Sequence, residues 1–115
     1  MKIYISLPIS GKEKVARVRA AKVANIIKQA GHTPVNPFDI YAGENPDYFD
    51  HLCCDLRAMM DCDMILFYGG MHHKSCGCQI EHNVAAELIF HKKKKFVLER
   101  ATDLQDVKFI LKNLK

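Results

Sequence analysis

Short apolar runs alternate with longer amphipathic segments along the whole chain. Residues 2–7, "KIYISL", are apolar and rich in β-favouring side chains. Residues 63–69, "DMILFYG", form a continuous apolar run of the kind found in strands that are buried on both faces. Between these runs, apolar residues recur at helical spacing over residues 12–30, and Gly31 supplies the helix stop. The pattern therefore predicts strands that alternate with helices.

The remaining segments follow the same pattern. Two prolines hold one stretch in an extended conformation, and apolar periodicity marks three more helices and one more strand. In chain order these are the extended stretch 32–38, a helix from about 48 to 61, a helix from about 78 to 91, a strand at 94–99 and a helix at 103–114.

This alternation predicts an α/β fold of the flavodoxin-like type, a three-layer sandwich with helices on both faces of a parallel sheet. We expect four strands in the order 2-1-3-4, in a single domain that spans residues 1–115. Such sheets bind ligands at the carboxyl ends of the strands, where the strand order reverses. Two loops overlook that crevice, "LPISGK" after the first strand and "GGMHHKSCGC" after the third.

Charge and composition narrow the function classes. The formal net charge of +4 is small, and much of the positive charge lies in one run, from His91 to Lys95, that is typical of a helix C-terminus. A nucleic-acid reader would spread its basic residues over a face, so we expect no nucleic-acid polymer as partner. No apolar run is long enough for a membrane span, and no signal peptide is recognisable, so we expect a cytoplasmic protein without membrane contact.

The cysteines and histidines raise the question of a metal site. The chain has five cysteines, an odd number that does not favour a disulfide framework. Cys76 and Cys78 together with His72, His73 or His82 offer four zinc ligands, but a C-x-C pair on one loop is weak support for a structural site. We expect small thiols that fit a turn, and neither a metal nor another cofactor.

The loop after the first strand is a candidate anion site. "SLPISGK" opens a helix, and helix N-termini bind phosphate through free backbone N–H groups. Lys12, Lys14 and Arg17 lie close enough to assist. The spacing of a Walker loop is absent, so a plain strand-to-helix turn stays an alternative.

Two carboxylates are candidates for catalysis. Glu81 falls in what the pattern predicts to be the first turn of a helix, where an acid is also favoured by the helix dipole alone. Asp55 lies on the helical face of Leu52, Leu56 and Met59, and an acid at the edge of an apolar face needs a partner or a function. Two acids in different environments can divide the roles of nucleophile and acid.

Three segments resemble the nucleoside 2-deoxyribosyltransferase family, which includes deoxynucleoside 5'-monophosphate N-glycosidases. They are "KIYISLPISG", "DLRAMMDCDMILF" and "SCGCQIEHNVA", and the likeness extends from about residue 2 to residue 98. The motifs that carry it are a tyrosine in the first strand, an aspartate ahead of the third strand, and a polar residue followed by a glycine and, six residues after the polar one, a glutamate.

The resemblance implies a role for each matching residue. Glu81 would attack C1' of a 2'-deoxyribosyl group and form a covalent glycosyl-enzyme intermediate. Asp55 would protonate the departing nucleobase, and the hydroxyl of Tyr4 would orient the nucleophile. The acceptor would be water or a second base.

The same resemblance implies the substrate end of the site. Family members that act on free nucleosides carry an aspartate where this chain has Ser75, and a serine hydroxyl can donate to a 5'-phosphate that an aspartate would repel. Gly77 would let the ligand approach the backbone. The further substrate-binding residues of the first loop would be Pro8, Ile9, Ser10 and Gly11.

We therefore expect a small nucleoside or nucleotide as partner, and a homodimer. Two alternatives stay open: a nucleotide-binding or sensing module that has the pocket without turnover, and a small zinc-binding protein. The pair His72–His73 matches no motif of the family, and an exposed loop is the simplest interpretation of it.

Overall fold

The computed structural model describes residues 1–9, 11–70, 75–91 and 95–114 of the chain. Within this part, strands and helices alternate, and a short 3-10 helix follows the second strand. The elements are β1 (Lys2–Ser6), α1 (Glu13–Gln29), β2 (Thr33–Val35), η1 (Pro37–Asp39), α2 (Tyr48–Met60), β3 (Met64–Tyr68), α3 (Cys76–Phe90), β4 (Val97–Ala101) and α4 (Leu104–Lys112).

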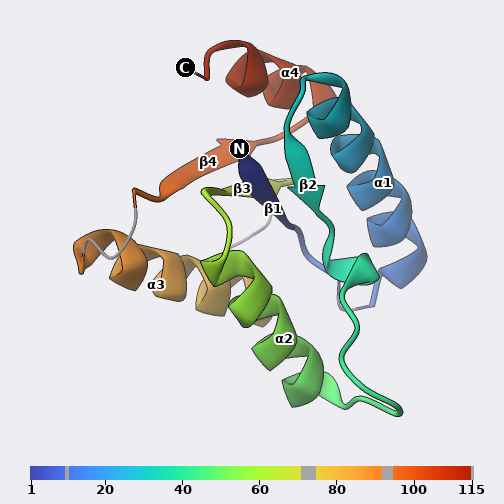
Figure 1. Ribbon diagram of the computed structural model, residues 1–115. Coiled ribbons are helices and arrows are strands. Elements are labelled where there is room, and N and C mark those ends of the chain that lie inside the picture. The colour runs from blue at the N-terminus through green and yellow to red at the C-terminus, as the bar shows by residue number, and fades with distance from the viewer. Residues whose placement is uncertain (10, 71–74, 92–94, 115) are drawn as a thin grey trace.

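The strands form one parallel sheet in the order β2-β1-β3-β4 (Figure 1). β1 lies between β2 and β3, and Tyr4 pairs with Val35 on one side and with Ile65 on the other. The predicted fold class and strand order are confirmed. The strand order reverses between β1 and β3, so the predicted crevice lies where these two strands end.

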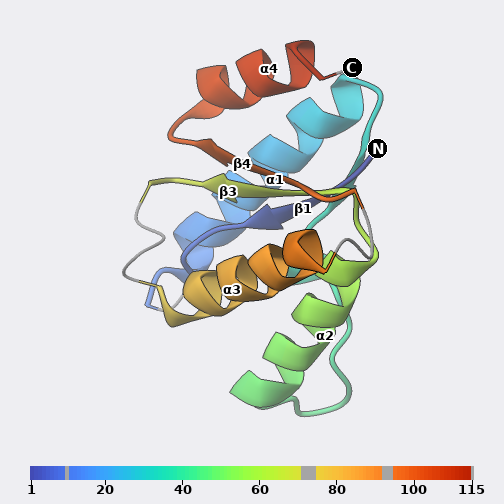
Figure 2. The same ribbon diagram turned by 90° about the vertical axis from the view of Figure 1, so that its left-hand side faces the viewer.

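The helices cover the sheet in two layers. α1 and α4 pack on one face, and α2 and α3 lie on the other (Figure 2). Successive side chains of a strand point to opposite faces. Ile3, Ile5 and Leu7 therefore face α1, and Tyr4 and Ser6 face α3.

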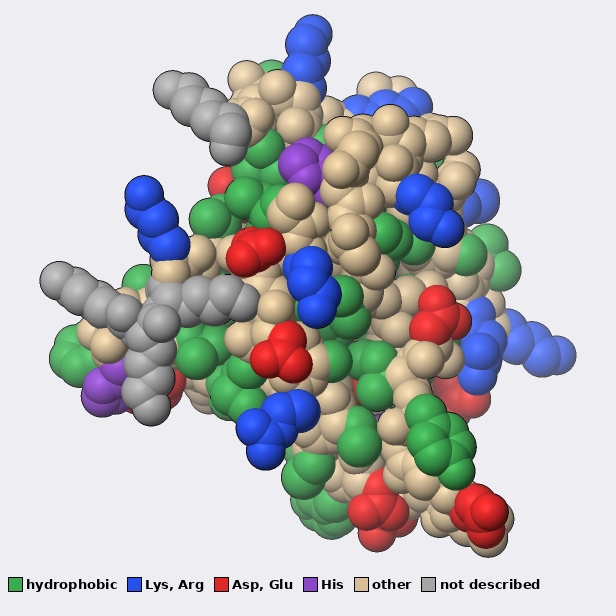
Figure 3. All heavy atoms as spheres, in the orientation of Figure 1, with side chains coloured by type: hydrophobic (Ala, Val, Ile, Leu, Met, Phe, Trp, Pro, Cys, Tyr) green, Lys and Arg blue, Asp and Glu red, His purple; other side chains and the backbone are tan. Residues whose placement is uncertain are grey.

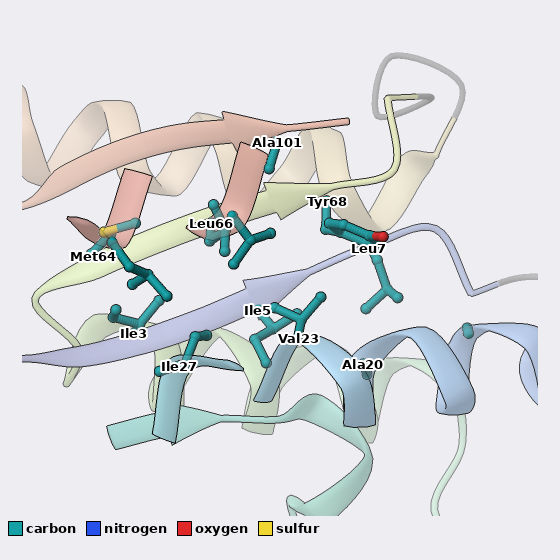
Figure 4. Packing of buried hydrophobic residues seen from close by; sticks show 13 residues of the cluster. Ile3, Ile5, Leu7, Ala20, Val23, Ile27, Met64, Leu66, Tyr68 and Ala101 are labelled. Atoms are coloured by element: carbon teal, nitrogen blue, oxygen red, sulfur yellow. The ribbon is translucent and has the colours of Figure 1, made fainter. Parts of the chain in front are cut away.

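The layer between the sheet and helices α1 and α4 is an apolar core. Ile3 and Ile5 of β1 pack with Leu66 of β3 and with Val23 and Ile27 of α1, and each of these side chains is 0% exposed (Figure 4). Burial of branched aliphatic side chains of this size contributes roughly 1.5–3 kcal/mol each before the entropy cost of ordering them. This layer fixes β1, and β1 in turn carries two residues of the candidate site.

Helix α2 packs more loosely than its neighbours. It begins in a capping box of Asp47 and Asp50, and Met59 near its C-terminal end is its one buried residue. Both ribbon views show its N-terminal half projecting away from the sheet (Figures 1 and 2). Tyr48 and Phe49 are consequently exposed at its first turn.

Some predicted boundaries were wrong by a few residues. α3 begins at Cys76 rather than near residue 78, because Ser75 caps it by accepting a hydrogen bond from the backbone N–H of Cys78. β4 covers 97–101 instead of 94–99, since its ladder with β3 starts at Val97 opposite Met64. The extended stretch 32–38 is divided into β2 and η1.

The longest helix of the described chain is α1, with 17 residues. None of the helices in that part of the chain has the length and apolar character needed to cross a membrane.

Candidate active site

A cavity of about 400 Å³ opens at the carboxyl end of β1. Its walls come from β1 and the loop after it, from α1 and η1, and from the facing sides of α2 and α3. The lining residues are Tyr4, Ile5, Ser6, Leu7, Ile9, Glu13, Arg17, Pro37, Phe38, Ile40, Tyr48, His51, Leu52, Asp55, Ser75, Gly77, Cys78 and Glu81. The site therefore brings together residues that lie up to 77 positions apart in the sequence.

Glu81 is a buried carboxylate held by two hydroxyl groups. Its side chain belongs to the second turn of α3, and the residue is 7% exposed. The Tyr4 hydroxyl donates to Oε2 at 2.5 Å, and the Ser6 hydroxyl donates to Oε1 at 2.7 Å. Hydrogen bonds to an ionised acceptor are short and strong, so both carboxylate oxygens are fixed in orientation.

The local sequence explains why these three groups meet. Tyr4 and Ser6 are two residues apart on β1 and therefore point to the same face of the sheet. Ser75 starts α3 at a position from which Cys78 and Glu81, three residues apart, lie on the helix face toward β1. Because the helix begins two residues earlier than predicted, Glu81 lies beyond the first turn, where the stabilisation of an acid by the helix dipole has largely faded. That simpler explanation of the glutamate is therefore weakened.

Burial controls the charge of Glu81. Loss of hydration raises the pKa of this carboxyl to about 7, the hydrogen bonds from Tyr4 and Ser6 oppose the rise, and the charge of Asp55 adds to it. The phenol of Tyr4 shows the same dominant effect, since its pKa is raised well above 10, first by burial and then by the charge of Glu81. Tyr4 therefore remains a hydrogen-bond donor at physiological pH.

Asp55 contributes a second carboxyl to the same cavity. It lies in the middle of α2, is half-buried, and lines the wall that also carries Tyr48 and Leu52. Burial raises its pKa to about 6. The two predicted acids thus share one cavity, and each has a pKa that is suited to proton transfer near neutral pH.

Of the residues predicted for the substrate end, Ser75, Gly77 and Ile9 line the cavity. The Ser75 oxygen accepts from the Cys78 backbone N–H, and the Ser75 hydroxyl also interacts with the Cys78 sulfur. A Cβ added at Gly77 would find only the Tyr48 hydroxyl oxygen, at 3.9 Å, so the fold itself does not require glycine there.

The other predicted members of the first loop contribute less. Pro8 is half-buried and Gly11 is exposed with φ +76, and neither lines the cavity. Glycine tolerates this left-handed backbone without strain, and Gly11 therefore serves the turn into α1. Ser10 lies outside the described residues.

Sequence reasoning missed Ser6 and the wall formed by η1. Ser6 is 1% exposed, and a polar residue in an apolar strand is itself a signal because it needs a partner when buried. Phe38 of η1 lines the cavity, and the guanidinium carbon of Arg17 lies 4.7 Å from the centre of its ring. Arg17 is the single Lys or Arg side chain among the lining residues that the structure describes.

The cysteines of the opening turn of α3 point in different directions. Cys76 is exposed, whereas Cys78 is 1% exposed and lies against Ser6. His82 packs on the ring of Phe67, with 5.7 Å between ring centres. Among the described residues no three His, Cys, Asp or Glu side chains are grouped as metal ligands, and His72 and His73 lie outside those residues.

Charged side chains of both signs are interleaved on the face of the molecule seen in Figure 3. That face carries no continuous basic patch of the kind that binds nucleic acid. Most of the basic run that begins at His91 lies outside the described residues.

The family model for a domain of unknown function, DUF4406, matches residues 1–93. The chain belongs to this family. No curated protein matches its sequence.

Two solved structures share the fold over nearly the full length of both chains. The CMP N-glycosidase BcmB of Clostridium botulinum has a TM-score of 0.60 and 14% identity, and the match covers 97% of this chain and 98% of that one. The 2-deoxyribosyltransferase of the psychrotolerant bacterium Bacillus psychrosaccharolyticus has a TM-score of 0.64 and 18% identity, with 100% and 93% covered. The resemblance predicted from the three sequence motifs is therefore confirmed at the level of the fold.

Proposed function

We propose that the protein cleaves the N-glycosidic bond of a 2'-deoxynucleoside or its 5'-monophosphate, or transfers the sugar to a second base, through a covalent intermediate on Glu81. One observation supports this proposal above the others. A buried carboxylate, held on both oxygens by hydroxyl donors, faces a cavity in which a second, half-buried carboxyl is available as an acid. This is the arrangement that a double displacement at an anomeric carbon requires.

In the first step, an oxygen of Glu81 forms a bond to C1' and the bond from C1' to the nucleobase nitrogen breaks. Asp55 gives its proton to the departing base and becomes a carboxylate. In the second step, water or another base attacks C1', its proton goes to Asp55, and Glu81 leaves as a carboxylate. The transition states carry positive charge on the sugar ring, which the ionised acid beneath it stabilises.

The active form has Glu81 ionised and Asp55 protonated. Because the pKa of Glu81 is about 7 and that of Asp55 about 6, this form is a minority of the free protein and is most populated between these two values. As the pH rises, activity should first increase because Glu81 loses its proton. It should then decrease because Asp55 loses its proton. We therefore expect a bell-shaped profile with its maximum between pH 6 and 7.

The two structural neighbours frame the range of substrates. Their names assign CMP to one protein and a 2-deoxyribosyl group to the other. In this chain, an uncharged hydroxyl at Ser75 and the absence of a side chain at Gly77 favour a ligand whose 5' end carries phosphate. Arg17 supplies positive charge in the same cavity.

Release of free base tests the proposal. The protein is incubated with each of the four deoxynucleoside monophosphates, with CMP and with the free nucleosides, with and without a second base, and the products are separated by chromatography. We expect free base from at least one deoxynucleotide, none from Glu81→Gln, and wild-type release from Glu87→Gln, an exposed glutamate of the same helix. Tight binding without release by the wild type would instead support the nucleotide-binding module.

The role of Ser75 has its own test. Ser75→Asp keeps a helix-capping oxygen but brings a negative charge to the cavity wall. We expect the ratio of kcat/KM for monophosphate over nucleoside to fall by roughly ten-fold or more, since one unpaired like charge costs at least about 1.4 kcal/mol at close range. An unchanged ratio would contradict the assignment of Ser75 to the phosphate end.

A further inference from the structure

Ser6 is a buried hydroxyl that holds one oxygen of Glu81, and neither step of the proposed reaction assigns it a specific effect. It is 1% exposed at the carboxyl end of β1, on the same face of the strand as Tyr4. Its oxygen lies 2.7 Å from Glu81 Oε1 and 3.3 Å from Cys78 Sγ. Both neighbours belong to α3, so the hydroxyl joins strand and helix at the reacting carboxylate.

The single proton of Ser6 can serve only one of these neighbours at a time. The carboxylate is the stronger acceptor and the closer one, so the proton points to Glu81. Burial raises the pKa of the Cys78 thiol, which therefore stays neutral and is the weaker acceptor of the two. The shorter contact with Glu81 thus fixes the direction of the Ser6 hydroxyl.

The hydroxyls of Tyr4 and Ser6 donate to different oxygens of Glu81. The strength of these two hydrogen bonds follows the negative charge on the carboxylate. That charge is complete in the active form of the free protein, is lost in the glycosyl ester, and returns as the ester breaks down. Donors that bind the full carboxylate most strongly therefore favour the second step, in which Glu81 is the leaving group. In that step the electron pair of the C1'–O bond moves onto Glu81, the new bond from C1' forms to water or a base, and Ser6 keeps its proton.

We propose that Ser6 is a positioning residue that holds Oε1 of Glu81 and speeds the breakdown of the covalent intermediate by stabilising Glu81 as the leaving group. This inference rests on the proposed function. The orienting tyrosine alone would hold one oxygen, and the carboxylate plane would then be free to rotate about the Tyr4 contact. Ser6 supplies the second point that fixes the plane.

The first test needs no substrate. Glutamate carboxyl carbons are labelled with ¹³C and titrated by NMR in the wild type, in Ser6→Ala and in Ser6→Thr, and Glu81 is assigned by its absence in Glu81→Gln. We expect Ser6→Ala to raise the pKa of Glu81, because a donor to the charged form is lost, and Ser6→Thr to restore it. An unchanged titration in Ser6→Ala would overturn the inference even if Ser6→Thr does not fold.

The second test follows the reaction. With the nucleotide that releases base fastest, Ser6→Ala should show a rapid burst of free base followed by turnover that is roughly ten- to a hundred-fold slower, while the covalent adduct accumulates. Ile27→Val, a mild change in the apolar core on the other face, controls for destabilisation alone and should show no burst. Slower turnover of Ser6→Ala without a burst or adduct would contradict the leaving-group role.

These two tests separate this inference from the proposed function. If the wild type releases no base but Ser6→Ala shifts the titration of Glu81, the contact is real and the reaction is wrong. If the wild type is active and neither the titration nor the burst responds to Ser6→Ala, the reaction stands and the role of Ser6 is wrong.

Discussion

The two faces of the sheet are built from the same strands but differ in chemistry. Toward α1 and α4, β1 presents Ile3, Ile5 and Leu7 to a layer of aliphatic side chains (Figure 4). Toward α3, the alternate positions present Tyr4 and Ser6 to a carboxylate. Both faces gain stability from apolar burial, but the second also buries an acid at a cost in stability. The first face therefore holds β1 in place, and the fixed strand positions Tyr4 and Ser6 against Glu81 on the second face.

The largest effect should come from removing the carboxylate at the second face. Glu81→Gln keeps the shape of the side chain but removes the nucleophile, and we expect base release to fall by on the order of 10⁴-fold or more. Initial rates of base release measure the effect. Retention of more than a tenth of the wild-type rate would contradict the assignment of Glu81.

Asp55→Asn should have the next largest effect, roughly 10²- to 10⁴-fold on kcat/KM, because general acid catalysis of base departure is lost. The fall in rate on the alkaline side of the maximum, which comes from deprotonation of Asp55, should disappear from the pH profile, and the rise controlled by Glu81 should remain. Asp61→Asn, an exposed acid at the end of the same helix, is the matched control. If Asp55→Asn still lost activity on the alkaline side of the profile, that loss would belong to another group.

Neighbouring residues of β1 separate the two faces most sharply. Tyr4→Phe removes one donor to Glu81 and leaves the buried ring, so activity should fall roughly ten- to a hundred-fold, and the free energy of unfolding should fall by about 1–3 kcal/mol where Glu81 is ionised. Ile5→Val should lower the free energy of unfolding by about 1 kcal/mol and leave kcat per folded molecule unchanged. Urea unfolding and steady-state rates on both variants provide the comparison. If Tyr4→Phe and Ile5→Val reduced activity equally, the two faces of β1 would not differ in their contribution to catalysis.

The stability of the protein should also depend on pH through Glu81. Its pKa is about 7 in the folded protein against an ordinary 4.5, so the folded state binds more protons between these values and the free energy of unfolding falls as pH rises through them. The full difference corresponds to about 3 kcal/mol. Glu81→Gln should remove this dependence and be more stable than the wild type at pH 8. If the free energy of unfolding changed equally with pH in the two proteins between pH 5 and pH 8, the raised pKa of Glu81 would be contradicted.

Much of this arrangement could be predicted from the sequence, because periodicity reports burial directly. The apolar runs and helical spacings predicted the strands and their order and made the two acids candidates, whereas their catalytic roles were implied by the family resemblance. The start of α3 was placed two residues late, since a capping serine followed by "CGC" has little helical propensity and the helix there is decided by tertiary contacts. Ser6 was missed although its signal was present, as the one polar side chain on the inward face of an otherwise apolar strand.

Detection of the covalent intermediate tests most directly whether Glu81 is the nucleophile. The protein is mixed with its best deoxynucleotide, quenched in acid within milliseconds to seconds, and analysed by intact mass and peptide mapping. We expect an added deoxyribosyl phosphate on the peptide that contains Glu81, formed as fast as base is released and absent in Glu81→Gln. Base release by the wild type without any adduct on this peptide, or undiminished release by Glu81→Gln, would contradict it.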